Sequence, residues 1–166
     1  MDSPPETPTT ALGDPAASLD RQDLLEILPY GEAFLFVDRV EKITDHEIEA
    51  TYRVPEDSSL LRAHFVDFPL MPGVLTGEGL AQAGAVLVRR HIPDHKEKHL
   101  LAMKIREATF FGLARPGETL VYRVALEKLG SKMAKLRGEA RVGDRLVARA
   151  QITLAVVSRN DLGAAA

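Results

Sequence analysis

A helix that is apolar on every face is predicted from residue 73 to about residue 91. Its apolar residues are Val74, Leu75, Leu80, Ala81, Ala83, Ala85, Val86, Leu87 and Val88. A helix of this kind is buried on all sides. Gly77, Gly79 and Gly84 interrupt it, although glycine costs about 1 kcal/mol relative to alanine in a helix interior. We therefore expect a neighbouring element to approach the helix backbone closely.

Alternating apolar and polar residues predict strands on both sides of this helix. Two strands are expected before it and four after it, over residues 34–43, 47–54, 99–109, 119–129, 132–142 and 145–157. Gly130-Ser131 and Gly143-Asp144 are typical two-residue hairpin links in which glycine adopts positive φ. The last three strands are therefore predicted to form an antiparallel meander.

This order of elements predicts an α+β fold. Six antiparallel strands with one apolar helix after the second require a curved sheet that wraps around the helix, and its open edges favour pairing of two protomers. A short helix is also expected over residues 19–28, capped by Ser18. We assign residues 19–158 to one domain, residues 1–18 to a flexible tail and residues 159–166 to a C-terminal tail.

One acidic residue, Glu78, lies inside the apolar helix, and Gln82 follows it on the same face. A buried carboxylate needs a hydrogen bond, a partner charge or a proton, so we expect a raised pKa or a close partner. His64, on the loop before the helix, is a candidate partner. From spacing alone, a structural role in which Glu78 simply bonds Gln82 and backbone is equally open.

Composition excludes several classes of function. The chain has 166 residues, 45% of them hydrophobic and 27% charged, which is ordinary for a globular protein. A net charge of −3 does not indicate nucleic acid, and the lack of cysteine excludes disulfides and cysteine nucleophiles. No apolar run is long enough to span a membrane, and the first 18 residues hold no basic residue, so we expect a cytoplasmic protein.

A specific motif surrounds the helix start. It contains His64-Phe65, then the run from Pro69 to Leu75 (PLMPGVL), then Glu78 and Ala81-Gln82. With FLFVDRV upstream and RPGE downstream, this pattern resembles the β-hydroxyacyl-[acyl carrier protein] dehydratases of type II fatty acid synthesis. The resemblance spans about residues 24–157. It implies a hotdog fold, in which the curved sheet wraps the long helix, and a homodimer with shared active sites, often assembled as a trimer of dimers.

The resemblance also implies roles for individual residues. His64 of one protomer is expected to remove the α-proton of a 3-hydroxyacyl thioester, and Glu78 of the other to protonate the leaving hydroxyl. The backbone N–H groups of Gly73 and Val74 would bind the thioester oxygen. Gln82 would orient Glu78, while Phe65 and Phe110 would line the acyl site. The expected partner is acyl carrier protein, and no cofactor or metal is expected.

Two other activities and a non-catalytic binding role are alternatives to dehydration. A hotdog thioesterase would use a helix carboxylate to activate water without a histidine, whereas an enoyl-CoA hydratase of this fold usually places its aspartate before its histidine. A non-catalytic acyl-thioester binder is supported only by Val66-Asp67, where the family usually has Pro-Gly. The sequence departs from the family pattern at two further places. Tyr30 stands where the family commonly has histidine, and Phe111-Gly112 stands where it commonly has basic residues.

Other polar positions carry weaker predictions. His91, His95 and His99 are spaced four apart, but Pro93 breaks the helix between them, so a metal site is not expected. Arg89 and Arg90 are expected to be solvated at the helix C-terminus. Together with Lys96 and Lys98 they could alternatively attract an acidic carrier protein.

Overall fold

One curved antiparallel sheet dominates the computed structural model, which describes residues 18–163. Its strand order is β1-β2-β4-β5-β6-β3. The strands are β1 (Arg39–Ile43), β2 (Glu47–Arg53), β3 (Lys98–Phe110), β4 (Thr119–Leu129), β5 (Met133–Val142) and β6 (Arg145–Ser158). The helices are α2 (Arg21–Ile27), α3 (Ser59–His64), α4 (Gly73–Arg89) and α5 (Arg159–Gly163), with 3₁₀ turns η1 (Glu32–Phe34) and η2 (His95–Glu97). The α+β prediction is confirmed.

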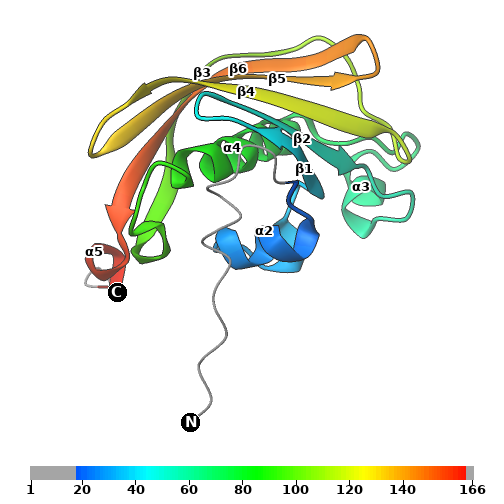
Figure 1. Cartoon of the computed structure of the whole chain (residues 1–166). Helices are drawn as coiled ribbons and strands as arrows, with labels where there is room; N and C mark the ends of the chain where they lie inside the picture. The colour runs from blue at the N-terminus through cyan, green and yellow to red at the C-terminus, as the bar shows by residue number, and fades with distance from the viewer. Residues whose placement is uncertain (1–17, 164–166) are drawn as a thin grey trace.

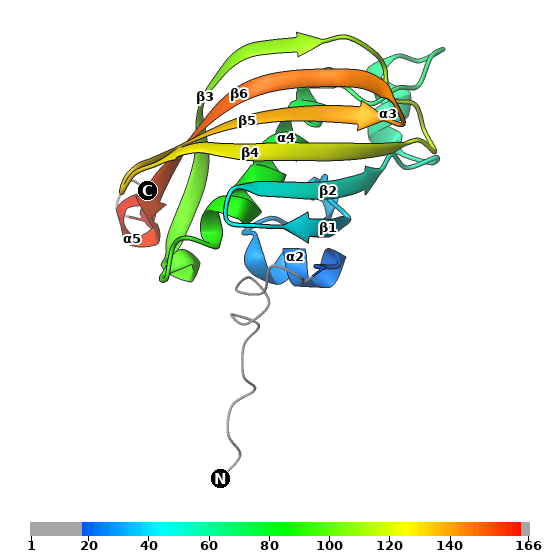
Figure 2. The same ribbon diagram turned by 45° about the horizontal axis from the view of Figure 1, so that its top comes forward.

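The elements form three layers. Figure 1 shows the sheet arched over α4, with α2 on the side of α4 that faces away from the sheet. Seen from above in Figure 2, β1 and β3 lie at the two edges of the sheet. The predicted meander is confirmed, because β4, β5 and β6 are consecutive antiparallel neighbours.

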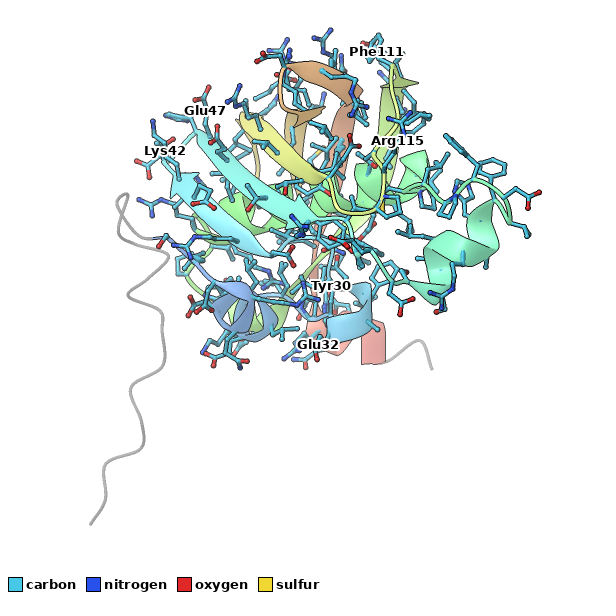
Figure 3. All side chains as sticks on the ribbon, turned by 90° about the vertical axis from the view of Figure 1, so that its right-hand side faces the viewer. Tyr30, Glu32, Lys42, Glu47, Phe111 and Arg115 are labelled. Carbon is cyan, nitrogen blue, oxygen red and sulfur yellow. The ribbon has the colours of Figure 1, made fainter. Side chains whose placement is uncertain are left out.

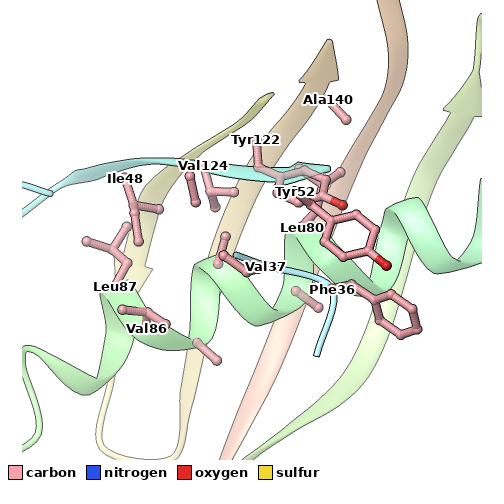
Figure 4. Close-up of a cluster of buried hydrophobic side chains, with 14 of the residues drawn as sticks. Phe36, Val37, Ile48, Tyr52, Leu80, Val86, Leu87, Tyr122, Val124 and Ala140 are labelled. Carbon is pink, nitrogen blue, oxygen red and sulfur yellow. The ribbon is translucent and has the colours of Figure 1, made fainter. Parts of the chain in front are cut away.

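The core lies between α4 and the concave face of the sheet. Figure 4 shows Leu80 and Leu87 of α4 facing Ile48, Tyr122 and Val124 of the sheet, and all five side chains are at most 2% exposed. Burying a leucine or valine side chain is worth about 1.5 to 3 kcal/mol. The contact between α4 and the sheet is therefore a major source of the stability of the fold.

Two of the three glycines in α4 are explained by this contact. A Cβ on Gly79 would lie 2.3 Å from the Tyr122 hydroxyl oxygen, and one on Gly84 would lie 2.6 Å from Leu136 Cδ1. Gly77 has no such neighbour within 4 Å. The expected close approach is therefore confirmed at Gly79 and Gly84.

Burial of α4 is less complete than its composition suggests. Every residue from Gly79 to Arg89 is buried, but of the preceding residues of the helix only Thr76 is, and Val74 is 72% exposed. Pro72 is the N-cap residue of the helix. The N-terminal end of α4 is thus the part that remains open in the single chain.

Several local predictions need correction. The cap of α2 is Asp20, which forms a reciprocal capping box with Asp23, while Leu19 pairs with Val40 as an isolated bridge instead of beginning the helix. The first strand begins at Arg39, five residues later than predicted. Asp20 caps the helix instead of Ser18 because Leu19 is held in the bridge to Val40, so the helix begins only after that residue.

Short helices replace two stretches expected to lack regular structure. Helix α3 occupies residues 59–64 and is capped by Ser58, whose hydroxyl accepts a bond from the N–H of Leu61. Helix α5 occupies residues 159–163 of the predicted C-terminal tail. Residues 1–17 of the predicted N-terminal tail lie outside the described residues.

The two hairpin links differ from each other. Gly143 has a φ of 55°, as predicted for the link between β5 and β6. The link between β4 and β5 spans residues 130–132 and is closed by a bond from Gly130 N–H to Met133 O. Gly130 is not among the positive-φ residues of the described chain, so that part of the prediction is wrong. Within residues 18–163, no helix is both long and apolar enough to cross a bilayer.

We expect Gly79→Ala to destabilise the protein by about 1 to 3 kcal/mol, because the new methyl group would overlap the fully buried Tyr122 ring. Gly77→Ala is the matched control on the same helix. It should be neutral or stabilising by up to about 1 kcal/mol, because it has space and gains helix propensity. Urea unfolding of both variants measures the difference, and equal effects would contradict this view of the α4 contact.

Candidate active site

Gln82 organises the polar part of α4. The side chain is 0% exposed, and its Oε1 accepts a 2.9 Å bond from the backbone N–H of Phe36. Its Nε2 donates to the backbone oxygen of Phe34 at 2.9 Å and to Glu78 Oε1 at 3.1 Å. One amide therefore holds the segment before β1 against α4 and also fixes the position of the Glu78 carboxyl.

Glu78 lies at the border between the buried and open parts of α4. Burial raises the pKa of its carboxyl, and the hydrogen bond from Gln82 offsets only part of this effect. The predicted bond between Glu78 and Gln82 is observed, and the burial of the carboxyl agrees with the predicted direction of its pKa. A carboxyl with a raised pKa is suited to hold a proton and donate it to a leaving group.

His64 is the last residue of α3. Its Nδ1 lies 3.2 Å from the backbone oxygen of Leu70, and its ring packs against Phe65 with centroids 4.3 Å apart. If Nδ1 carries the hydrogen and donates to Leu70, then Nε2 is left as the basic nitrogen. The Leu70 carbonyl thus favours the tautomer that a general base needs.

The start of α4 offers two backbone donors. Leu75 N–H and Thr76 N–H both donate to Pro72 O, at 3.0 and 3.1 Å, which leaves the N–H groups of Gly73 and Val74 without an acceptor among the described residues. The ring of Phe110 covers Gly73 so closely that a Cβ there would lie 2.8 Å from its Cδ1. A side chain at this position would therefore overlap the Phe110 ring next to these N–H groups.

The aromatic side chains predicted for the acyl site are largely exposed. Phe65 is 53% and Phe110 is 48% exposed. Phe111 is exposed at the end of the molecule that also carries Arg115, as Figure 3 shows, and the Arg149 guanidinium lies 5.9 Å from its ring centroid. Within a single chain these side chains lack the cover that a closed acyl site requires.

The structure brings some predicted site residues together and keeps others apart. Glu78 and Gln82 form one unit, and Gly73 and Phe110 form another. Among residues 18–163, no hydrogen bond or ion pair joins His64 to Glu78. A single chain therefore does not assemble the predicted catalytic pair.

Sequence reasoning missed two parts of the site. The backbone of Phe34 and Phe36 is bound by Gln82 across more than 45 positions, a contact that no local pattern signals. Tyr30 packs against Phe34 with ring centroids 5.8 Å apart, and burial together with the charge of Glu78 raises its pKa. The one signal in the sequence for a role of Tyr30 was that it stands where the family commonly has histidine.

The predictions for the end of α4 are partly wrong. Arg89 is only 3% exposed, although solvation was expected, and Arg90 donates to Asp45 at 3.0 Å. The three spaced histidines make separate contacts. His91 bonds the backbone oxygen of Asp45, His95 is buried, and His99 lies beside Arg159.

Comparisons with known proteins identify the family. The family model described as a FabA-like domain matches residues 28–151, about three quarters of the chain. This protein belongs to the FabA-like family. The hotdog fold predicted from the central motif is thereby confirmed.

Curated relatives of this FabA-like protein share most of its length. One is the 3-hydroxyacyl-[acyl-carrier-protein] dehydratase FabZ of Wolinella succinogenes, 38% identical over 84% of this chain and 97% of the relative. Another is the dehydratase of the same name from Nitratidesulfovibrio vulgaris, 38% identical over 90% of this chain and 99% of the relative. The likeness covers both the helix that carries Glu78 and the strands around it.

Solved structures show the same fold at lower identity. The dehydratase heterocomplex ApeI:P from Xenorhabdus doucetiae matches with a TM-score of 0.70 and 19% identity, over 84% of this chain and 93% of that chain. A thioesterase from Haemophilus influenzae matches with a TM-score of 0.61 and 15% identity, over 84% and 92%. At these identities the likeness concerns the fold alone.

We expect Gln82→Leu to destabilise the FabA-like fold by about 2 to 4 kcal/mol, because it leaves the N–H of Phe36 and the carbonyl of Phe34 buried without partners. Gln22→Leu, on the exposed face of α2, is the control and should change stability by less than about 0.5 kcal/mol. Urea unfolding at pH 7 checks both values. A Gln82→Leu variant as stable as the control would show that the amide does not hold the segment before β1.

Proposed function

We propose that this protein dehydrates (3R)-3-hydroxyacyl thioesters, carried by acyl carrier protein, to trans-2-enoyl thioesters in fatty acid biosynthesis. The observation that carries the proposal is Glu78, a helix carboxyl with a raised pKa and a fixed orientation, in a chain 38% identical to 3-hydroxyacyl-[acyl-carrier-protein] dehydratases over nearly their whole length. The cytoplasm remains the predicted location, and no cofactor takes part in the proposed reaction.

The proposed mechanism divides the reaction among three groups. His64 Nε2 removes the α-proton, and its ring is oriented through the contact between Nδ1 and Leu70 O. Negative charge then grows on the thioester oxygen, which the N–H groups of Gly73 and Val74 stabilise at the positive end of the α4 dipole. Glu78 donates its proton to the β-hydroxyl, which leaves as water.

Binding of the acyl chain is assigned to the aromatic residues near the helix start. Phe110 lies directly over Gly73, and Phe65 lies next to His64, so both can contact a thioester positioned between the catalytic groups. Gln82 is a positioning residue, because it acts through Glu78 and through the segment before β1.

We further propose that the active site forms between two protomers. Strand β3 pairs only with β6 within the described chain, and every residue from Leu101 to Phe110 is exposed. A 13-residue edge strand that exposes Leu101, Met103, Ile105 and Phe110 is suited to pair with its copy. The pairing would cover the apolar edge and bring His64 of one protomer to Glu78 of the other; a trimer of such dimers is the predicted higher assembly.

We expect His64→Ala and Glu78→Gln each to lower kcat for dehydration by about 10² to 10⁴-fold, the usual worth of a general acid or base. The assay follows enoyl-thioester absorbance with a 3-hydroxyacyl thioester on acyl carrier protein or on coenzyme A. His46→Ala, in the exposed turn between β1 and β2, is the control and should retain activity. Release of free thiol without enoyl product would instead favour a thioesterase, and tight acyl binding without reaction would favour a binder.

A mixing experiment tests the shared site separately. After subunit exchange, His64→Ala and Glu78→Gln proteins form mixed dimers, and each mixed dimer holds one site with both groups intact. Random exchange should therefore restore about a quarter of the native activity. If both groups belonged to the same protomer, the mixture would stay as inactive as its components, although each variant alone would still lose activity.

A further inference from the structure

A cavity lies at the far end of α4 from the proposed catalytic groups. It has a volume of about 170 Å³ and is formed by the end of α2, the C-terminal end of α4, the segment from η2 into β3, and the beginning of α5. Figures 1 and 2 both show α5, in red, beside the green segment that enters β3. We call this cavity the cationic pocket, because Arg89, Lys96, Lys98 and Arg159 line it.

Arg89 is the unusual member of the cationic pocket. It is 3% exposed and donates only to neutral acceptors, the backbone oxygens of His95 at 2.5 Å and Lys98 at 3.2 Å. Its Nε is buried without any hydrogen-bond partner, and no carboxylate among the described residues forms an ion pair with it. A buried guanidinium without a counter-charge is costly, by several kcal/mol, unless an anion compensates it.

The other charges around the pocket do not supply this compensation. Lys98 is paired with Asp94 at 3.4 Å, and Arg159 bonds the His99 ring at 3.3 Å. Glu26 is the single acid among the described lining residues, against four cations. Burial lowers the pKa of Arg89; Tyr30 offsets part of this effect, and the positive charge of Arg159 adds to it. The pocket therefore has an excess of positive charge around a desolvated arginine.

We propose that the cationic pocket binds a phosphate group, either as free phosphate or as part of a small organic phosphate. Arginine and lysine side chains that converge on a small cavity provide the charge and the donors that phosphate oxygens need. The apolar wall formed by residues 27–29 leaves room for a carbon skeleton attached to the phosphate. The Nε–H of Arg89 would gain an acceptor through movement of the guanidinium toward the bound anion.

This pocket is separate from the proposed catalytic site. Glu78 and Arg89 are 11 residues apart on α4, which corresponds to about 16 Å along the helix axis. The bound phosphate would contact parts of α2, α4, the segment from η2 into β3, and α5, and would therefore stabilise the folded protein by linkage. Residues 27–29 lead directly to Tyr30 and the segment held by Gln82, so occupancy would also restrain one side of the site.

The test is binding of inorganic phosphate to the full chain at pH 7. Calorimetric titration and thermal unfolding, both against chloride at equal ionic strength, should show saturable binding and a rise in Tm at millimolar phosphate, where general salt stabilisation is small. Glycerol 3-phosphate and adenosine monophosphate form the second arm. Tighter binding of either would assign the site to an organic phosphate, and preference for inorganic phosphate would assign it to the free ion.

Substitutions of the lining cations test whether phosphate binds in the cationic pocket. Lys96→Gln and Arg159→Gln change exposed residues and should each weaken phosphate binding by about tenfold, and the double variant by more. Arg89→Gln should abolish it, but the two milder variants keep the test valid if Arg89→Gln does not fold. Arg137→Gln, in an ion pair with Glu127 on β4, is the matched control. No saturable binding, or equal binding by the double variant and the control, would overturn the proposal.

Discussion

Burial of α4 against the concave face of a single curved sheet is the constraint on which the rest of this structure depends. The sheet can approach the helix only because Gly79 and Gly84 lack side chains, so that Tyr122 and Leu136 occupy the space directly over the helix backbone. This contact makes the interior around the helix dry. It thereby determines the electrostatic behaviour of every polar group that α4 carries.

Three polar side chains on α4 differ in how their polar groups are satisfied in this interior. Gln82 satisfies its amide completely, through two backbone groups and Glu78. Glu78 is held at the border of the dry region, where its pKa is raised and it still faces the open end of the helix. Arg89 is buried with carbonyl partners only and keeps an unpaired Nε. The first arrangement is structural, the second suits proton transfer, and the third leaves a charge that favours an anion.

The open parts of the single chain are as informative as its core. Strand β3 is exposed from Leu101 to Phe110, Phe110 covers Gly73 at the start of α4, and no bond joins His64 to Glu78 among the described residues. A second protomer that covers these parts would shield the aromatic residues and complete the catalytic pair. In this proposal the same surface therefore serves both dimer assembly and catalysis.

Much of the architecture was determined by sequence alone. The all-round apolar pattern of residues 73–91 and the alternation in the last four strands are local signals, and each placed its element within a few residues. The motif around His64 and Glu78 is a specific signal of the family. Tertiary structure alone decided the length of the first strand, the bridge of Leu19 to Val40, the attachment of Phe34 and Phe36 to Gln82, and the burial of Arg89. These outcomes depend on which distant segments compete for the same backbone groups and the same interior space, and periodicity along a chain carries no information about that competition.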